Sequence, residues 1–109
     1  MATEHISKIE KAALEDPDVK FGYDNYELLK QIGEFVREMR SDASLSQMDL
    51  HRASGIPQSE ISRLENGAME RGPSLSTLAR LAHAAGKRLV IGIEDPEGGA
   101  NASARVLTL

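Results

Sequence analysis

The stretch Leu45-Ser46-Gln47-Met48-Asp49-Leu50, followed by Gly55-Ile56-Pro57 and then by Gln58-Ser59-Glu60-Ile61-Ser62-Arg63-Leu64-Glu65-Asn66-Gly67, decides the fold of this chain. Ser46 with Asp49 three residues later predicts a helix start, because each side chain can bond the other residue's backbone N–H. Gly55 predicts the end of that helix, since a left-handed residue is least strained as glycine. A second helix follows, which Pro57 suits at its start and Asn66-Gly67 ends. The stretch therefore predicts two short helices joined by a tight turn.

The residues before this stretch predict two further helices. Apolar residues at helical spacing predict one helix over residues 3–15, which Asp16-Pro17 ends because the residue before proline avoids the helical conformation. Residues 17–24 predict a turn-rich connector. Asp24 and Glu27 have the spacing of a capping box for the next helix, which should fade near residue 41. Its apolar stripe consists of Leu28, Leu29, Ile32, Phe35, Val36 and Met39.

The residues after the stretch predict a helix and then a strand. Ser74 is a suitable cap for a helix that Gly86 ends. Residues 88–93 are β-branched and apolar, which favours a strand. A lone strand is not stable, so we expect it to pair with its own copy in a dimer or with another chain. Residues 96–104 read as a linker, and residues 105–109 are too short to interpret. The expected division is an acidic helix and connector (1–23), a helical domain (24–87), a strand (88–95) and a flexible tail (96–109).

Composition and charge limit the class of protein. The chain has 109 residues, no cysteine and a net charge of −4. Without cysteine there is no disulfide framework and no cysteine-based metal site. No apolar run is long enough to span a membrane, and the N-terminus lacks the pattern of a secretory signal, so we expect a cytoplasmic protein. The charge is uneven, because net values of −4, +2 and −2 fall on residues 1–27, 28–88 and 89–109. A mildly basic centre is compatible with DNA, and acidic flanks suit a basic protein partner or a solvated surface.

The second helix of the stretch has the polarity of a helix that reads the major groove. Ile61 and Leu64 can anchor one side, which leaves a polar side outward. Glutamine can bond an adenine edge, arginine can bond guanine or phosphate, and serine can reach either class of target. Helix N-termini favour phosphate, and loop residues can add phosphate contacts. The predicted DNA-binding residues are Gln47, Gln58, Ser59, Ser62, Arg63, Asn66 and Arg71.

With these residues in place, the chain resembles the Cro/phage-repressor (XRE) helix-turn-helix family. The resemblance runs from about Arg40 to Gly86 and includes the segments LSQMDL, SGI, SEISRLENG, PSLSTLARLA and AG. It implies an all-α, compact helix-turn-helix bundle that dimerises on a palindromic operator. It also implies an ion pair between Arg40 and Glu65 that supports the recognition helix. Two residues depart from the family pattern: His51 stands where a small alanine is usual, and Pro57 replaces the usual Ser/Thr cap.

Three further features resemble the HigA-type antitoxins of type II toxin–antitoxin systems. They are the run from Leu14 through Asp16-Pro17 to Val19 followed by Tyr23, the strand after the last helix, and the acidic N-terminus. This resemblance implies a repressor of its own operon that neutralises a small basic toxin, a ribonuclease of the RelE type. Residues 1–27 are the first candidate for the toxin surface and residues 88–93 the second. The strand alone also resembles HipB-type antitoxins, whose partner is a kinase.

Other interpretations of the function remain open. One is a stand-alone repressor without a protein partner, and another is an interaction module that has lost DNA binding, which the net charge of −4 motivates. An enzyme is not expected, because no catalytic constellation has supporting context. His5, His51 and His83 follow no metal-ligand spacing, so we expect neither a metal nor a cofactor. The operator sequence and the toxin cannot be deduced from the sequence.

Overall fold

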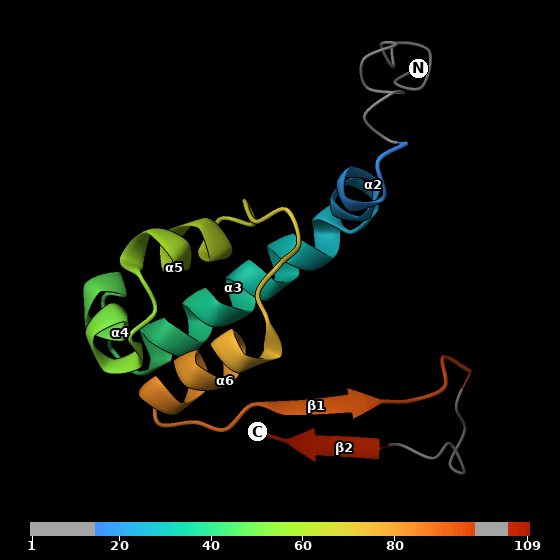
Figure 1. The fold of residues 1–109 in the computed structure, drawn as a ribbon. Coiled ribbons are helices and arrows are strands. Elements are labelled where there is room, and N and C mark those ends of the chain that lie inside the picture. The colour runs from blue at the N-terminus through green and yellow to red at the C-terminus, as the bar shows by residue number, and fades with distance from the viewer. Residues whose placement is uncertain (1–14, 98–104) are drawn as a thin grey trace.

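The computed structural model describes residues 15–97 and 105–109. Within these residues the chain forms five helices and a small antiparallel sheet that extends to one side of them (Figure 1). The elements are α2 (Pro17–Asp24), α3 (Tyr26–Asp42), α4 (Gln47–Ser54), α5 (Gln58–Glu65), α6 (Leu75–Ala84), β1 (Val90–Ile93) and β2 (Arg105–Thr108). The expected fold class, a helix-turn-helix bundle followed by a C-terminal strand, is confirmed.

The core lies where α3, α4, α5 and α6 meet. In Figure 1 the long helix α3 runs diagonally between α5 and α6, and α4 closes one end of the bundle. The largest fully buried side chains come one from each of these helices: Val36, Leu50, Ile61 and Leu81. Each of the four helices is therefore held by at least one side chain that is removed from water.

A glycine in α3 allows the closest approach in the bundle. A Cβ atom on Gly33 would lie 2.5 Å from the carbonyl oxygen of Leu64 and 2.7 Å from that of Glu65. Both oxygens belong to the backbone of the last turn of α5, so a larger side chain could not be accommodated by a rotamer change. Gly33 therefore sets the distance between α3 and the end of α5.

The connector predicted over residues 17–24 is a helix, so that prediction was wrong. The carbonyl of Asp16 accepts a hydrogen bond from the backbone N–H of Lys20 (2.9 Å), and its carboxylate accepts one from that of Asp18 (2.9 Å). Pro17 occupies the first helical position, where its missing N–H costs nothing. Asp16-Pro17 therefore starts a helix here. The helix expected over residues 3–15 lies outside the described residues except for Glu15.

The capping box predicted for α3 is also absent. Asp24 is the last residue of α2, and the N-cap of α3 is Asn25, whose side chain makes no capping hydrogen bond. Because α2 continues through Asp24, that residue cannot adopt the extended conformation of a helix cap. The expected apolar stripe is divided: three of its members are buried and Ile32 is half-buried, whereas Leu28 and Phe35 are exposed.

The local signals around α4, α5 and α6 are confirmed. Ser46 and Asp49 form a complete capping box, with both hydrogen bonds at 3.0 Å. Gly55 ends α4 in the left-handed region with φ of 75°, and α5 begins after Pro57 without a side-chain cap. The Ser74 hydroxyl accepts a hydrogen bond from the backbone N–H of Thr77 at the start of α6. The side chains of Ser46 and Ser74 thus satisfy backbone N–H groups that would otherwise lack partners at the starts of α4 and α6.

The strand after α6 pairs with a second strand of the same chain. β1 runs antiparallel to β2, with Val90 opposite Thr108 and Ile93 opposite Arg105. The backbone N–H of Leu109 adds a bond of 2.8 Å to the carbonyl of Leu89, which is buried against the core. The end of the expected tail is thus a strand. The sequence did not reveal it, because four residues are too few for a clear alternation.

Candidate nucleic-acid interface

Helix α5 has one anchored side and one open side. Ile61 and Leu64 are buried in the core, as expected of the anchoring positions. The polar positions predicted to read DNA lie on the remaining surface: Gln58, Ser59 and Arg63 are exposed and Ser62 is half-buried. Each of these positions lies one, three or four residues from at least two of the others, which gives them one continuous face of the helix. An exposed polar face of this kind is what a helix needs to enter the major groove.

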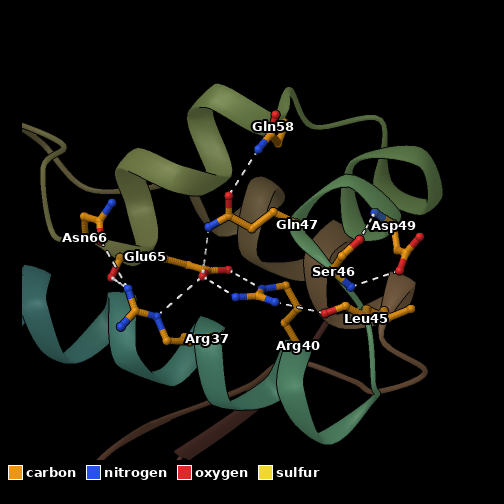
Figure 2. Close-up of polar contacts among 9 residues, drawn as sticks. All are labelled: Arg37, Arg40, Leu45, Ser46, Gln47, Asp49, Gln58, Glu65 and Asn66. Atoms are coloured by element: carbon orange, nitrogen blue, oxygen red, sulfur yellow. Dashed lines mark hydrogen bonds and ion pairs between the residues drawn. The ribbon is translucent and has the colours of Figure 1, made fainter.

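Two glutamines link the start of α5 to α4. The side-chain Nε2 of Gln58 donates to Oε1 of Gln47 (3.3 Å), and Nε2 of Gln47 donates to Oε1 of Glu65 (3.2 Å) (Figure 2). Gln47 is half-buried between the two helices, and Gln58 is exposed. Because Gln47 uses its oxygen for Gln58 and its nitrogen for Glu65, the chain of bonds fixes the orientation of both amides. The Oε1 atom of Gln58 accepts no hydrogen bond from residues 15–97 or 105–109, so it can face a ligand.

The buried carboxylate of Glu65 is the centre of this network. Arg40 of α3 forms a two-pronged ion pair with it, through Nε to Oε2 (2.7 Å) and Nη2 to Oε1 (2.8 Å). A third nitrogen of Arg40 donates to the carbonyl of Leu45 (2.9 Å), just before α4. Arg37 adds a longer contact at 3.6 Å. The Arg40–Glu65 pair implied by the family resemblance therefore ties α3, α4 and α5 together (Figure 2).

The charge state of this network follows from its contacts. Burial raises the pKa of Glu65, but hydrogen bonds from Arg40 and Gln47 and the charges of Arg40 and Arg37 outweigh it, so the pKa is lower than usual. The hydrogen bond to Glu65 raises the pKa of Arg40, against the opposing effect of burial. Both groups are therefore ionised at neutral pH, and the pair is fully charged.

Arg37 also orients Asn66 at the other end of α5. Its Nη2 donates to Oδ1 of Asn66 (3.1 Å) and to the carbonyl of Glu65 (3.4 Å). With its oxygen engaged, Asn66 has its NH₂ group left as a donor that no acceptor in the described part of the chain uses. A donor suits a phosphate oxygen. Sequence reasoning missed Arg37, and the only signal was its position one helical turn before Arg40.

Arg71 lies where the sequence suggested, in the loop after α5, but its guanidinium is engaged. It forms an ion pair with the carboxylate of Asp18 in α2. Both side chains are mostly exposed, so the pair is open to exchange with other ions. The ion pair between Arg71 and Asp18 could not be predicted from the sequence, because the two residues are 53 positions apart.

The turn between α4 and α5 is braced by side chains. The Nδ1 atom of His51 lies 2.8 Å from the carbonyl oxygen of Ile56, and the Ser54 hydroxyl accepts from the N–H of Ile56 (3.1 Å). Arg80 of α6 donates to the carbonyl of Ser54 (2.8 Å). His51, which stands where the XRE pattern has a small alanine, thus contacts the turn between the two helices. The brace fixes the angle at which α5 leaves α4.

The histidines have structural contacts where they are described. His83 lies 3.0 Å from the carbonyl oxygen of Leu109, while His5 lies outside the described residues. In the described part of the chain, no group of three or more His, Cys, Asp or Glu side chains could hold a metal ion. Nor does any helix within residues 15–97 and 105–109 have the length and apolar character needed to cross a membrane.

Comparison with known proteins supports the assignment of the chain to the helix-turn-helix proteins. A family model described as a helix-turn-helix domain matches residues 31–87, which is more than half of the 109 residues. The match begins inside α3 and ends before β1, so α2 and the sheet lie outside it. No curated protein and no solved structure matches the chain. The match agrees with the resemblance to XRE proteins, and such domains are typical of regulators that are not enzymes. The chain belongs to the helix-turn-helix domain family of DNA-binding regulators.

Proposed function

We propose that this protein is a homodimeric repressor that binds a palindromic operator in its own promoter and also acts as the antitoxin of a small basic toxin. The observation that supports operator binding best is the exposed polar face of α5, whose first residue, Gln58, is held by Gln47. We assign Gln58 to an adenine edge and Arg63 to guanine or phosphate. Ser59 and Ser62 lie beside them and can reach bases or phosphates. A repressor acts on chromosomal DNA, so we expect it in the cytoplasm.

Contacts to the DNA backbone would flank the reading helix. The N-terminus of α4 at Gln47 presents backbone N–H groups to one phosphate. The free NH₂ group of Asn66 suits a second phosphate, and Arg71 would reach a third by leaving Asp18. These contacts position the protein, whereas the residues of α5 select the sequence.

Binding to the promoter at increasing salt tests this proposal. Fluorescence anisotropy with a labelled promoter duplex should show affinity that falls steeply with salt, because basic side chains displace counterions from phosphates. Arg63→Ala should weaken binding at least tenfold. Arg105→Ala, which removes the same charge from β2, is the matched control and should bind like the unchanged protein. Binding that does not depend on salt, or equal binding by both variants, would refute the assignment and favour a pure interaction module.

The antitoxin role rests on the parts of the chain outside the family match. Residues 1–27 have a net charge of −4, which is suited to a basic toxin such as a RelE-like ribonuclease. The two-stranded sheet is the second candidate surface, since each strand has one partner in the described residues and an outer edge remains open. Pairing of such edges between two copies would also support the dimer, as the resemblance to HipB-type antitoxins suggests.

Coexpression with the neighbouring reading frame tests the antitoxin role. We expect a stable complex with a small basic protein that is toxic when expressed alone. Deleting residues 1–22 should abolish that complex and preserve operator binding. If the complex survives the deletion, the N-terminal surface is wrong and the sheet becomes the candidate. If no complex forms while operator binding is tight, the protein is a stand-alone repressor.

A further inference from the structure

An apolar groove lies outside the DNA-reading surface, between α2, the start of α3 and the loop after α5. Its volume is about 330 Å³. Val19 and Tyr23 form its α2 wall, and Tyr26 and Leu29 of α3 and Met69 of the loop after α5 also line it. We call it the α2 groove. Its α2 wall lies entirely outside the family match, so this feature is an addition to the shared domain.

The groove is lined by large side chains that remain exposed. The exposed fractions are 45% for Val19, 64% for Tyr23 and 58% for Tyr26. Val19 and Tyr23 are four residues apart on one side of α2, and Tyr26 is the first residue of α3. Tyrosines are enriched among the residues that dominate binding energy at protein interfaces, because they bury a large area at low entropic cost. This surface therefore has the character of a binding site for an apolar side chain.

The charge around the groove specifies the partner. Residues 15–27 contain five acids and one lysine, which gives a net charge of −4. Asp18 of the α2 wall and Glu70 of the loop after α5 both line the groove. The nearby basic residues are Lys20, Lys30 and Arg71, which pairs with Asp18, so residues 15–30 and 67–71 together keep a net charge of −3. An acidic rim repels DNA phosphates, and a second copy of the same acidic helix would be repelled as well. A basic protein segment is the complementary occupant.

We propose that the α2 groove binds a basic segment of a partner protein, with one apolar side chain inserted between Tyr23 and Met69 and flanking Lys or Arg residues facing Asp18 and Glu70. This inference rests on the part of the proposed function that gives the chain a protein partner. It narrows the candidate surface from residues 1–27 to one groove, and it includes the α5–α6 loop, which the sequence did not suggest.

Two synthetic peptides of equal length and leucine content test the groove directly, one with lysines between the leucines and the other with glutamates. With the full-length ¹⁵N-labelled protein, the lysine peptide should shift the amide signals of Val19, Tyr23 and Met69 at millimolar concentration. The glutamate peptide should not. Equal shifts with both peptides, shifts confined to other regions, or no shifts at all would overturn the proposal.

Charge reversal at the rim provides the matched variants. Asp18→Lys combined with Glu70→Lys should reverse the preference, so that the glutamate peptide binds and the lysine peptide does not. Glu94→Lys changes an exposed acid after β1 and should leave the preference unchanged. If the double variant does not fold, Tyr23→Ala serves instead and should weaken the lysine peptide at least fivefold. A preference that stays the same in the folded double variant contradicts the inference.

Coexpression separates failure of the groove from failure of the antitoxin proposal. If the neighbouring protein copurifies with Tyr23→Ala as well as with the unchanged chain, the groove is not its binding site and the antitoxin role stands. If no neighbour copurifies with the unchanged chain while the lysine peptide occupies the groove, the antitoxin role fails and the groove remains a site for another basic protein.

Discussion

Removing the Arg40 side chain should destabilise the protein more than any other single loss of charge in the described structure. The carboxylate of Glu65 has a side-chain exposure of 0%, and that of Arg40 is 17%. Arg40→Ala removes two hydrogen bonds to Glu65 and one to the carbonyl of Leu45. The remaining partners of the buried carboxylate are Gln47 at 3.2 Å and Arg37 at 3.6 Å.

The size of the effect follows from the burial of the carboxylate. Breaking a buried ion pair by removing one partner costs about 3–5 kcal/mol, because the other charge stays in a medium that solvates it poorly. Gln47 and Arg37 still compensate in part, so we expect a loss of about 3 kcal/mol, near the lower end of that range. A domain of this size has a total stability of about 5–15 kcal/mol, so the loss is a large fraction.

Urea unfolding followed by circular dichroism measures this loss at neutral pH. Arg37→Ala is the matched control, because it removes a half-exposed arginine that contacts the same carboxylate. An exposed partner contributes about 1 kcal/mol or less, so the control should lose far less stability. If Arg40→Ala costs no more than Arg37→Ala, the buried pair does not stabilise the fold as argued.

The same variant has a pH dependence with a defined sign. In the unchanged protein burial raises the pKa of Glu65, but the hydrogen bonds from Arg40 and Gln47 outweigh this effect, so the folded pKa lies below the unfolded pKa. Ionised Glu65 therefore stabilises the fold at any pH above its unfolded pKa. This contribution is lost as the pH falls through the folded pKa. In Arg40→Ala burial dominates and the pKa rises, so protonation of Glu65 then stabilises the fold. The difference in stability between the two proteins should therefore be largest at pH 7 and narrower near pH 4. An equal difference at both pH values would contradict the assignment.

Three smaller perturbations follow from other contacts. Gly33→Ala gains about 1 kcal/mol of helix propensity, yet the clash with the α5 backbone should cost about 1–3 kcal/mol. We therefore expect a lower melting temperature and weaker DNA binding, and a raised melting temperature would contradict this. Asp18→Asn frees Arg71 from its ion pair and should tighten DNA binding, whereas an unchanged affinity means that Arg71 does not reach phosphate. Ser46→Ala should cost about 1 kcal/mol in urea unfolding, against no measurable change for the exposed Ser76→Ala.

The parts of the fold that sequence could predict are those with local causes. The capping box at Ser46 and the left-handed Gly55 each depend on residues within a few positions, so composition and spacing reveal them. The anchoring role of Ile61 and Leu64 follows from helical spacing alone. For the same reason the helix-turn-helix unit could be located to within a residue or two, and the two helices begin and end as expected.

The parts that sequence missed depend on distant contacts. Asp16-Pro17 is equally suited to ending one helix and starting another, and only the surroundings of α2 decide which occurs. β2 is four residues long and becomes a strand through its pairing with β1. The bond from Arg37 to Asn66 joins residues 29 positions apart, and no periodicity indicates it.

These distant contacts explain how a helix as short as α5 can be held rigidly. α5 has eight residues, and an isolated helix of that length is not stable in water. Its first residue is fixed through Gln47, whereas its last turn is fixed by Arg37, Arg40 and the close approach of Gly33. Both ends of α5 are therefore held in place by α3 and α4. It follows that substitutions in α3, which bear no predicted base contact, should change DNA affinity by moving the exposed polar face of α5. We therefore expect α3 to influence recognition as much as the residues predicted to contact the bases.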